Sequence, residues 1–164
     1  NENVDFVIRA RTNLDYPLDY VPVLLAKMNL LLVAHPKWKD QLHGSLDEIL
    51  GQVPVVAWKG NGEYAYWQLI HKITGQSMQY KTQAKLIVDD MDMMREAILK
   101  GLGIAVIPEV YVYEDLALGR LIQLDVEAEP AQSLIHAVHL GQRGMRPAVR
   151  HLLDWLKQVT ESLR

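Results

Sequence analysis

The stretch from residue 88 to residue 124 constrains the fold of this chain more than any other part of the sequence. Met91, Met94 and Ile98 recur at the spacing of one buried helical face, and Asp89 or Asp90 would cap the start of that helix. The run 104–107 (IAVI) has the length of a strand and no polar residue, which is typical of a strand buried on both faces. A second helix after Pro108 and a strand ending at residue 124 complete the stretch. It therefore predicts an α/β fold.

Two glycines, Gly101 and Gly103, separate the predicted helix from the buried strand. They resemble part of a dinucleotide-binding loop, but the third glycine of that motif would fall at Val106. The glycines also follow a helix and precede a strand, which reverses the order of the motif. Glycine just past a helix end commonly supplies a positive φ angle, so we interpret the pair as a helix stop and a tight turn.

The remaining pattern predicts strands and helices on both sides of this stretch. Ser45 and Glu48 form a capping box, which starts a short helix. Because strands alternate with helices, we expect a mainly parallel sheet with helices on its faces. An acidic connector is expected at residues 125–133. The expected strands are residues 4–9, 20–25, 28–34, 54–58, 85–88 and 134–140, and the other expected helices are residues 63–73 and 148–163.

Composition indicates a soluble globular protein. With 164 residues, 49% of them hydrophobic and 23% charged, the chain can bury the core of one domain or of two small lobes. A formal net charge of −3 and the lack of any lysine or arginine run argue against a nucleic-acid surface on this chain. The longest apolar run, residues 30–34, is too short to span a membrane. We expect a cytoplasmic protein, although a mature secreted protein would have the same composition.

Metal sites and nucleophiles find little support in the sequence. The chain has no cysteine, which excludes thiolate ligands and disulfides. The acidic residues around position 90 cannot open a calcium loop, because Met94 and Arg95 stand where the motif needs a ligand and a glycine. His136 and His139 are three positions apart on a predicted strand, so they would point to opposite faces. We expect no metal, no cofactor and no enzymatic activity.

Two groups of residues could hold a small anion. Arg9 and Arg11 end a predicted strand on the same face, where a guanidinium can hold a carboxylate through two hydrogen bonds. Gly60, Asn61 and Gly62 precede the helix predicted from residue 63, so their backbone N–H groups could meet an anion at its N-terminus. The alternatives are solvated surface charges for the arginines and a plain surface turn for the glycine-rich segment.

Three aromatic residues follow that turn. Tyr64, Tyr66 and Trp67 could stack on a ligand or pack into the protein. We expect Trp67 to pack, because large aromatic side chains mostly serve burial.

The order of these pieces resembles the effector-binding domain of LysR-type transcriptional regulators. Residues 5–9 (DFVIR) are similar to the family's strand that ends the first half-lobe, and residues 31–36 (LLVAHP) to its crossing into the second lobe. Residues 97–109 (AILKGLGIAVIPE) are similar to its most recognisable signature, and residues 115–121 (DLALGRL) follow in the expected place. With the strand from His136 and the closing helix, the resemblance covers essentially the whole chain.

The resemblance implies a two-lobed α/β fold of periplasmic-binding-protein type 2, with Rossmann-like lobes and a small effector in the cleft. Lobe one would comprise residues 1–36 and 134–164, and lobe two residues 37–133. The opening strand and helix of lobe one have no counterpart in this sequence, so the first lobe would be incomplete. The winged helix-turn-helix has no counterpart either, so DNA would be bound only through a domain absent from this chain.

The same resemblance implies a sensor that closes on a small anionic metabolite and shifts the geometry of a dimer or tetramer, with no membrane partner. The alternatives are a solute-binding protein of a transport system with the same fold, or an enzyme in which Asp89 or Asp90 is a catalytic acid. The effector-binding residues it implies are Arg9, Arg11 and Thr12 in lobe one, and Trp58, Lys59, Gly60, Asn61, Tyr64, Asp89, Asp90 and Pro108 in lobe two.

Overall fold

The computed structural model describes residues 5–58, 63–141 and 145–163. The chain forms two compact units: unit 1 consists of Asn1–Met28 and Gln132–Arg164, and unit 2 of Asn29–Ala131. The lobe boundaries expected after residues 36 and 133 lie a few residues further along the chain than this division. That the two units correspond to the two expected lobes remains a prediction.

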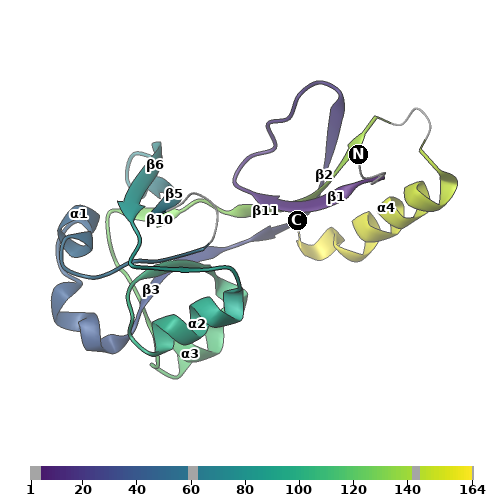
Figure 1. Ribbon diagram of the computed structural model, residues 1–164. Helices are drawn as coiled ribbons and strands as arrows, with labels where there is room; N and C mark the ends of the chain where they lie inside the picture. Colours follow the sequence, from purple (N-terminus) through teal and green to yellow (C-terminus); the bar gives the residue numbers. More distant parts are fainter. Residues whose placement is uncertain (1–4, 59–62, 142–144, 164) are drawn as a thin grey trace. The chain divides into compact units, whose positions relative to one another are not determined.

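Unit 1 is built on a three-stranded antiparallel sheet with a helix on one face (Figure 1). Strand β11 lies in the middle of the sheet and pairs with both other strands, with one register shift between Ile135 and His136. The closing helix is confirmed as α4, which a short 3-10 turn follows. The elements are β1 (Val7–Arg11), β2 (Tyr20–Met28), β11 (Ser133–Leu140), α4 (Pro147–Val159) and η3 (Glu161–Leu163).

The core of unit 1 is small. Leu25, Ala137 and Leu153 are its buried residues, with partly buried apolar side chains around them. Two apolar residues of α4, Leu152 and Val159, are 43% and 49% exposed. The sheet therefore covers only part of the helix's apolar surface.

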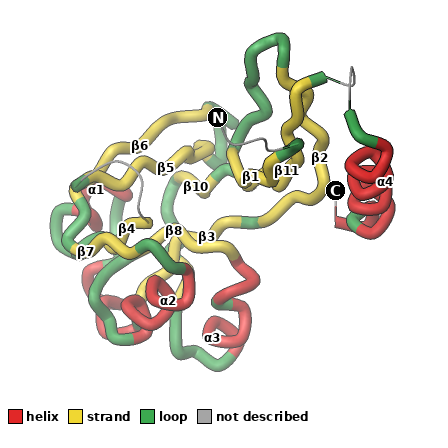
Figure 2. The backbone as a smooth tube through the Cα atoms, turned by 45° about the vertical axis from the view of Figure 1, so that its right-hand side comes forward, coloured by secondary structure: helices red, strands yellow, loops and turns green. Residues whose placement is uncertain are grey.

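Unit 2 is larger and contains the remaining helices and strands (Figure 2). Its helical elements are η1 (Pro36–Gln41), α1 (Leu46–Leu50), α2 (Met91–Leu99), η2 (Glu109–Tyr111) and α3 (Tyr113–Ala117). Its strands are β3 (Leu30–Ala34), β4 (Val56–Trp58), β5 (Tyr64–His71), β6 (Ser77–Gln83), β7 (Leu86–Val88), β8 (Ala105–Pro108), β9 (Ile122–Gln123) and β10 (Ala128–Pro130).

The expectation of a mainly parallel sheet is wrong. Strands β4 and β7 pair in parallel, and Val55 forms a parallel bridge with Ile104. The other ladders between described strands are antiparallel, in the groups β10–β5–β6 and β8–β3–β9 of unit 2 and in the sheet of unit 1. Among the described residues, strands alternate with helices from β3 to β4 and from β7 to β9, and the other strands pair through hairpins and long-range ladders.

The stretch around α2 folds as predicted. Asp90 caps the helix, its Oδ1 accepting a hydrogen bond from the Met93 amide at 3.0 Å. Met94 and Ile98 are buried, and Gly101 has a φ angle of +71° at the helix end. Gly103 has a different role from the one predicted, because a Cβ atom there would lie 2.3 Å from the carbonyl oxygen of Pro54. Its missing side chain lets two backbone segments approach each other.

The helix predicted over residues 63–73 is wrong, because the chain forms β5 there. Burial alternates along the strand: Tyr64 and Tyr66 are half-exposed, whereas Ala65 and Trp67 are buried. This two-residue period was hidden in the sequence, since its first two solvent-facing residues, Tyr64 and Tyr66, are aromatic. The burial of Trp67 confirms the packing role expected for it. Strands β6 and β10, the partners of β5, were not predicted.

A buried ion pair joins α2 to α3 in unit 2. Asp115 is fully buried and accepts hydrogen bonds from Arg95 Nε at 2.7 Å and Nη2 at 3.0 Å. Arg120 Nε lies 2.7 Å from Oδ1 of the same carboxylate, the oxygen that also accepts from Arg95 Nη2. The hydrogen bonds to Asp115 raise the pKa of Arg95. Two cations on one buried carboxylate satisfy its oxygen atoms away from water.

Candidate functional site

The face of the unit 1 sheet that carries Arg9 and Arg11 borders a cavity of about 450 Å³. Alternation along β1 directs both side chains to one face, as expected, with Arg9 opposite His136 of the neighbouring strand. The segment 12–19 between β1 and β2 contributes Tyr16 to the cavity wall, and the strand ends contribute Tyr20 and His139. The two predicted arginines therefore meet around one space within unit 1.

A buried histidine anchors the segment that covers this face. His136 is fully buried, and its Nδ1 lies 2.7 Å from the carbonyl oxygen of Leu134. Because a carbonyl only accepts, Nδ1 of His136 carries a hydrogen, and Nε2 forms a hydrogen bond of 2.7 Å with the Tyr16 hydroxyl. The two rings also meet edge to face, with centroids 5.5 Å apart. Tyr16 is held against the sheet by both contacts.

The charges around the cavity leave an excess of positive charge. Arg11 lies over the Tyr16 ring, 5.1 Å from its centroid, and neither Arg9 nor Arg11 forms an ion pair with another described residue. Of the two carboxylates in the wall, Asp5 is bound by Arg146, a contact that raises the pKa of the arginine. Asp15 is the other. The wall can therefore accept a single negative charge.

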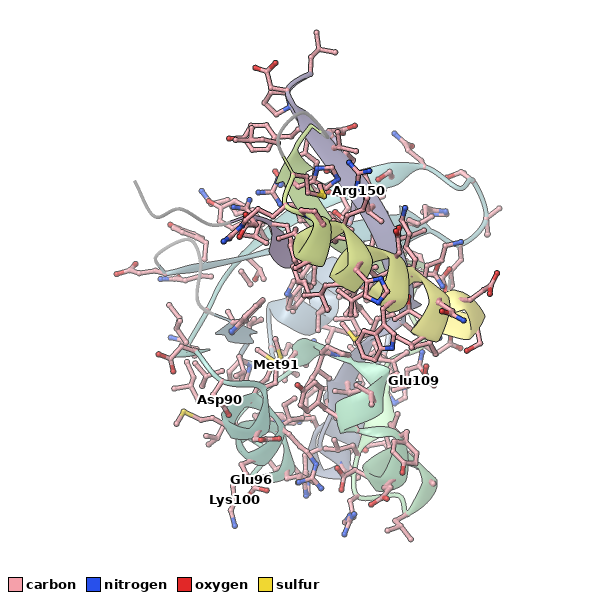
Figure 3. The ribbon with its side chains drawn as sticks, turned by 90° about the vertical axis from the view of Figure 1, so that its right-hand side faces the viewer. Asp90, Met91, Glu96, Lys100, Glu109 and Arg150 are labelled. Carbon is pink, nitrogen blue, oxygen red and sulfur yellow. The ribbon has the colours of Figure 1, made fainter. Side chains whose placement is uncertain are left out.

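In unit 2, the parallel pairing of β4 with β7 brings some of the predicted residues to one edge. Trp58 pairs with Val88, so Trp58 and the residues that follow Val88, Asp89 and Asp90, lie at the carboxyl ends of neighbouring strands. Trp58 is 56% exposed. Asp90 is engaged as the cap of α2, at whose start it lies with Met91 in Figure 3. An exposed indole beside carboxylates can contact a ligand with an amine or hydroxyl group.

The other predicted residues are less informative. Thr12 is exposed but does not line the unit 1 cavity. Tyr64 is half-exposed, with the Lys81 ammonium 4.1 Å from its ring centroid. Pro108 is buried at the end of β8, where it pairs with Leu30.

The predicted anion site at Lys59, Gly60 and Asn61 lies outside the described residues. Its argument required a helix from residue 63, and this part of the prediction is wrong because β5 begins at Tyr64. A strand offers no row of free N–H groups at its start comparable to a helix N-terminus.

Sequence reasoning missed the residues that complete the unit 1 cavity. Tyr16, Tyr20 and His139 were not proposed as ligand contacts, although the two tyrosines follow the arginines closely. Their position depends on the antiparallel pairing of β11 with β1 and β2, which joins segments more than a hundred residues apart.

A model of the LysR substrate binding domain matches residues 1–161. The chain belongs to the LysR substrate-binding domain family. This confirms the predicted fold class, a mixed α/β domain of periplasmic-binding-protein type 2, and the identification of an effector-binding domain. An uncharacterized HTH-type transcriptional regulator of Mycobacterium tuberculosis is 26% identical over 142 residues. The match covers 84% of this chain and 45% of the relative, so the chain spans less than half the length of that regulator.

Solved structures of LysR-type regulators share the fold of this LysR substrate-binding domain. The full-length virulence activator AphB of Vibrio cholerae has a TM-score of 0.70 at 19% identity, covering 95% of this chain and 52% of that one. The regulatory domain of CrgA from Neisseria meningitidis has a TM-score of 0.66 at 20% identity, covering 93% and 74%. These relatives are transcriptional regulators, in agreement with the prediction that the chain is not an enzyme.

Two further observations concern the described part of the LysR substrate-binding domain. None of its helices is long and apolar enough to cross a membrane. Within residues 5–58, 63–141 and 145–163, no three histidine, aspartate or glutamate side chains converge as metal ligands.

Proposed function

We propose that this chain is the sensing part of a bacterial LysR-type transcriptional regulator and that its effector is a small anionic metabolite. The observation that carries the proposal is the pair Arg9 and Arg11, two exposed cations that border one cavity without an ion-pair partner among the described residues. Guanidinium groups bind carboxylates and phosphates through paired, charge-assisted hydrogen bonds. The family match favours this function over the transport alternative.

The effector contacts predicted in unit 2 form a separate part of this proposal. Trp58, Asp89 and Asp90 lie at the carboxyl ends of β4 and β7, the strand ends at which open α/β sheets commonly bind ligands. An acidic pair suits an amine or hydroxyl group on the effector. The contacts expected at Thr12, Tyr64, Pro108 and the segment 59–61, and the position of the effector between two lobes, remain predictions.

Sensing would follow from a difference in effector affinity between two arrangements of the regulator. A ligand shifts such an equilibrium only by its differential binding, about 1.4 kcal/mol for each tenfold preference. We propose that the shift changes the geometry of a dimer or tetramer, and that DNA is bound through a domain outside this sequence.

Thermal unfolding in the presence of a panel of small anionic metabolites tests this function. At least one anion should raise the melting temperature, because a ligand that binds only the folded state stabilises it. Arg11→Ala should weaken that response, whereas Lys39→Ala, which removes an exposed cation of unit 2, should leave it unchanged. A panel without any effect, or a full response in Arg9→Ala and Arg11→Ala, would overturn the proposal.

A further inference from the structure

We infer that the cavity of unit 1 is itself a binding site for a small aromatic carboxylate, held by unit 1 residues alone. This inference rests on the proposed function and makes it more specific, because it names the class of ligand and the residues that bind it. Neither Thr12 nor any of the predicted effector-binding residues of unit 2 lines the cavity.

The charge of the wall selects a monoanion. Arg9 and Arg11 supply two positive charges, Asp15 supplies one negative charge, and Asp5 is neutralised by Arg146. One uncompensated guanidinium matches one carboxylate, which it can bind through two parallel hydrogen bonds. A doubly charged phosphate would leave a negative charge next to Asp15.

The rest of the wall selects an apolar, flat body. Val7 and Val138, which face each other across β1 and β11, form part of it together with Phe6 and Leu140. The rings of Tyr16 and Tyr20 border the same space, with centroids 6.4 Å apart and planes inclined by 40°. Tilted aromatic rings offer both faces and edges to a third ring, and such contacts add to the burial of apolar area.

The cavity is of suitable size and one of its walls is fixed. Its volume of about 450 Å³ lies within the range of about 300–1,000 Å³ that small-molecule sites occupy. The Tyr16 ring is held in place by its hydrogen bond to the buried His136, so the aromatic wall does not have to be ordered when a ligand enters. A wall that is already ordered lowers the entropic cost of binding.

Phenylacetate binding to the 164-residue chain tests this inference. Titration calorimetry measures the affinity, and NMR shifts of backbone amides locate the ligand. Phenylacetate should bind and should shift amides of β1, of segment 12–20 and of the end of β11. Phenylacetamide lacks the negative charge, acetate lacks the ring, and inorganic phosphate carries more than one negative charge. Each of the three should therefore bind at least about tenfold more weakly than phenylacetate.

Variants locate the site. Arg9→Gln combined with Arg11→Gln should weaken phenylacetate binding by about tenfold or more, because both cations are lost. Arg150→Gln removes an exposed charge from α4, outside this cavity, and should leave binding unchanged (Figure 3). Tyr16→Phe keeps the ring but loses its anchor, and should weaken binding to a smaller extent.

The outcomes separate this inference from the proposed function. If another anion binds and phenylacetate does not, or if phosphate binds more tightly than phenylacetate, the aromatic carboxylate site is wrong while the sensing function stands. Equal phenylacetate binding by the double arginine variant and the parent chain would also overturn the site. If no anion of the metabolite panel binds, both proposals fail.

Discussion

The two units of this LysR substrate-binding domain differ in how much of their structure is buried. Unit 2 encloses two clusters of buried apolar side chains, one around Ile49 and Leu69 and one around Ile98 and Ile107. Unit 1 has a single small cluster around Leu153, and most of β1 is exposed. Yet unit 1 carries the cavity with two arginines that form no ion pair with another described residue. The comparison indicates that unit 2 has the more extensive core, whereas the proposed ligand-binding surface lies where fewer apolar contacts oppose movement.

The largest effect is expected from Asp115→Ala in unit 2. Loss of this buried carboxylate leaves Arg95 and Arg120 without their common partner. The free energy of unfolding should fall by about 3 kcal/mol, near the lower end for a broken buried pair, because both arginines reach solvent. Urea unfolding measures this loss. Asp125→Ala breaks the exposed contact with Lys72 and should have no measurable effect. Equal effects of the two variants would contradict a buried scaffold in unit 2.

A smaller loss is expected from Leu153→Ala in unit 1. It removes the main contact of α4 with the sheet and should cost about 2 kcal/mol, at the low end for a buried leucine because the cluster is small and can collapse. Trp155 is the tryptophan of unit 1, while Trp38, Trp58 and Trp67 belong to unit 2. Unfolding of the Leu153→Ala variant can be followed by tryptophan fluorescence, with and without the further change Trp155→Phe. The difference between the two curves is the signal of unit 1, which should be lost before the signal of unit 2. Coincident loss in both units would show that they unfold as one.

Tyr16→Phe should cost about 1–2 kcal/mol, because it leaves the buried Nε2 of His136 without its hydrogen-bond partner. The effect should be confined to unit 1. Tyr113→Phe serves as the control, since it removes an exposed hydroxyl that donates to Glu114. Urea midpoints that are the same for both variants would argue against the anchoring role of His136.

The smallest effect is expected from the first turn of α1 in unit 2. Ser45→Ala removes the N-cap and should cost about 1 kcal/mol. Hydrogen bonds from the Ser45 backbone and side chain lower the pKa of Glu48 below the ordinary value of a glutamate. This stabilisation is complete above the unfolded pKa and is lost as the pH falls through the lower, folded pKa. Glu48→Gln should therefore remove part of the decline in stability below pH 4.5, and an unchanged pH profile would contradict it.

The elements that the sequence predicted well are those whose signals are local. Asp90, Met94 and Gly101 mark the start, the buried face and the end of α2 within a few turns of chain. The capping box of Ser45 and Glu48 is likewise complete within four residues. Such elements depend on contacts between near neighbours, which the sequence displays directly.

The elements that were missed depend on distant partners. Strand β5 is stabilised by β6 and β10, and Lys81 of β6 lies over the exposed rings of Tyr64 and Tyr66. None of these pairings has a local signal that distinguishes it from a helix. For the same reason Arg9 and Arg11 could be proposed from the sequence, but Tyr16 and His139 could not, because β11 brings them together from opposite ends of the chain.

Hydrogen–deuterium exchange with and without phenylacetate tests most directly whether unit 1 binds the ligand while unit 2 is the more stable unit. Without ligand, amides of β3 and β8 in unit 2 should exchange more slowly than those of β1 and β2. Phenylacetate should slow exchange in residues 7–20 and 133–140, and the Arg9→Gln, Arg11→Gln double variant should not show this protection. Protection confined to unit 2, or equal protection in the double variant, would contradict the account.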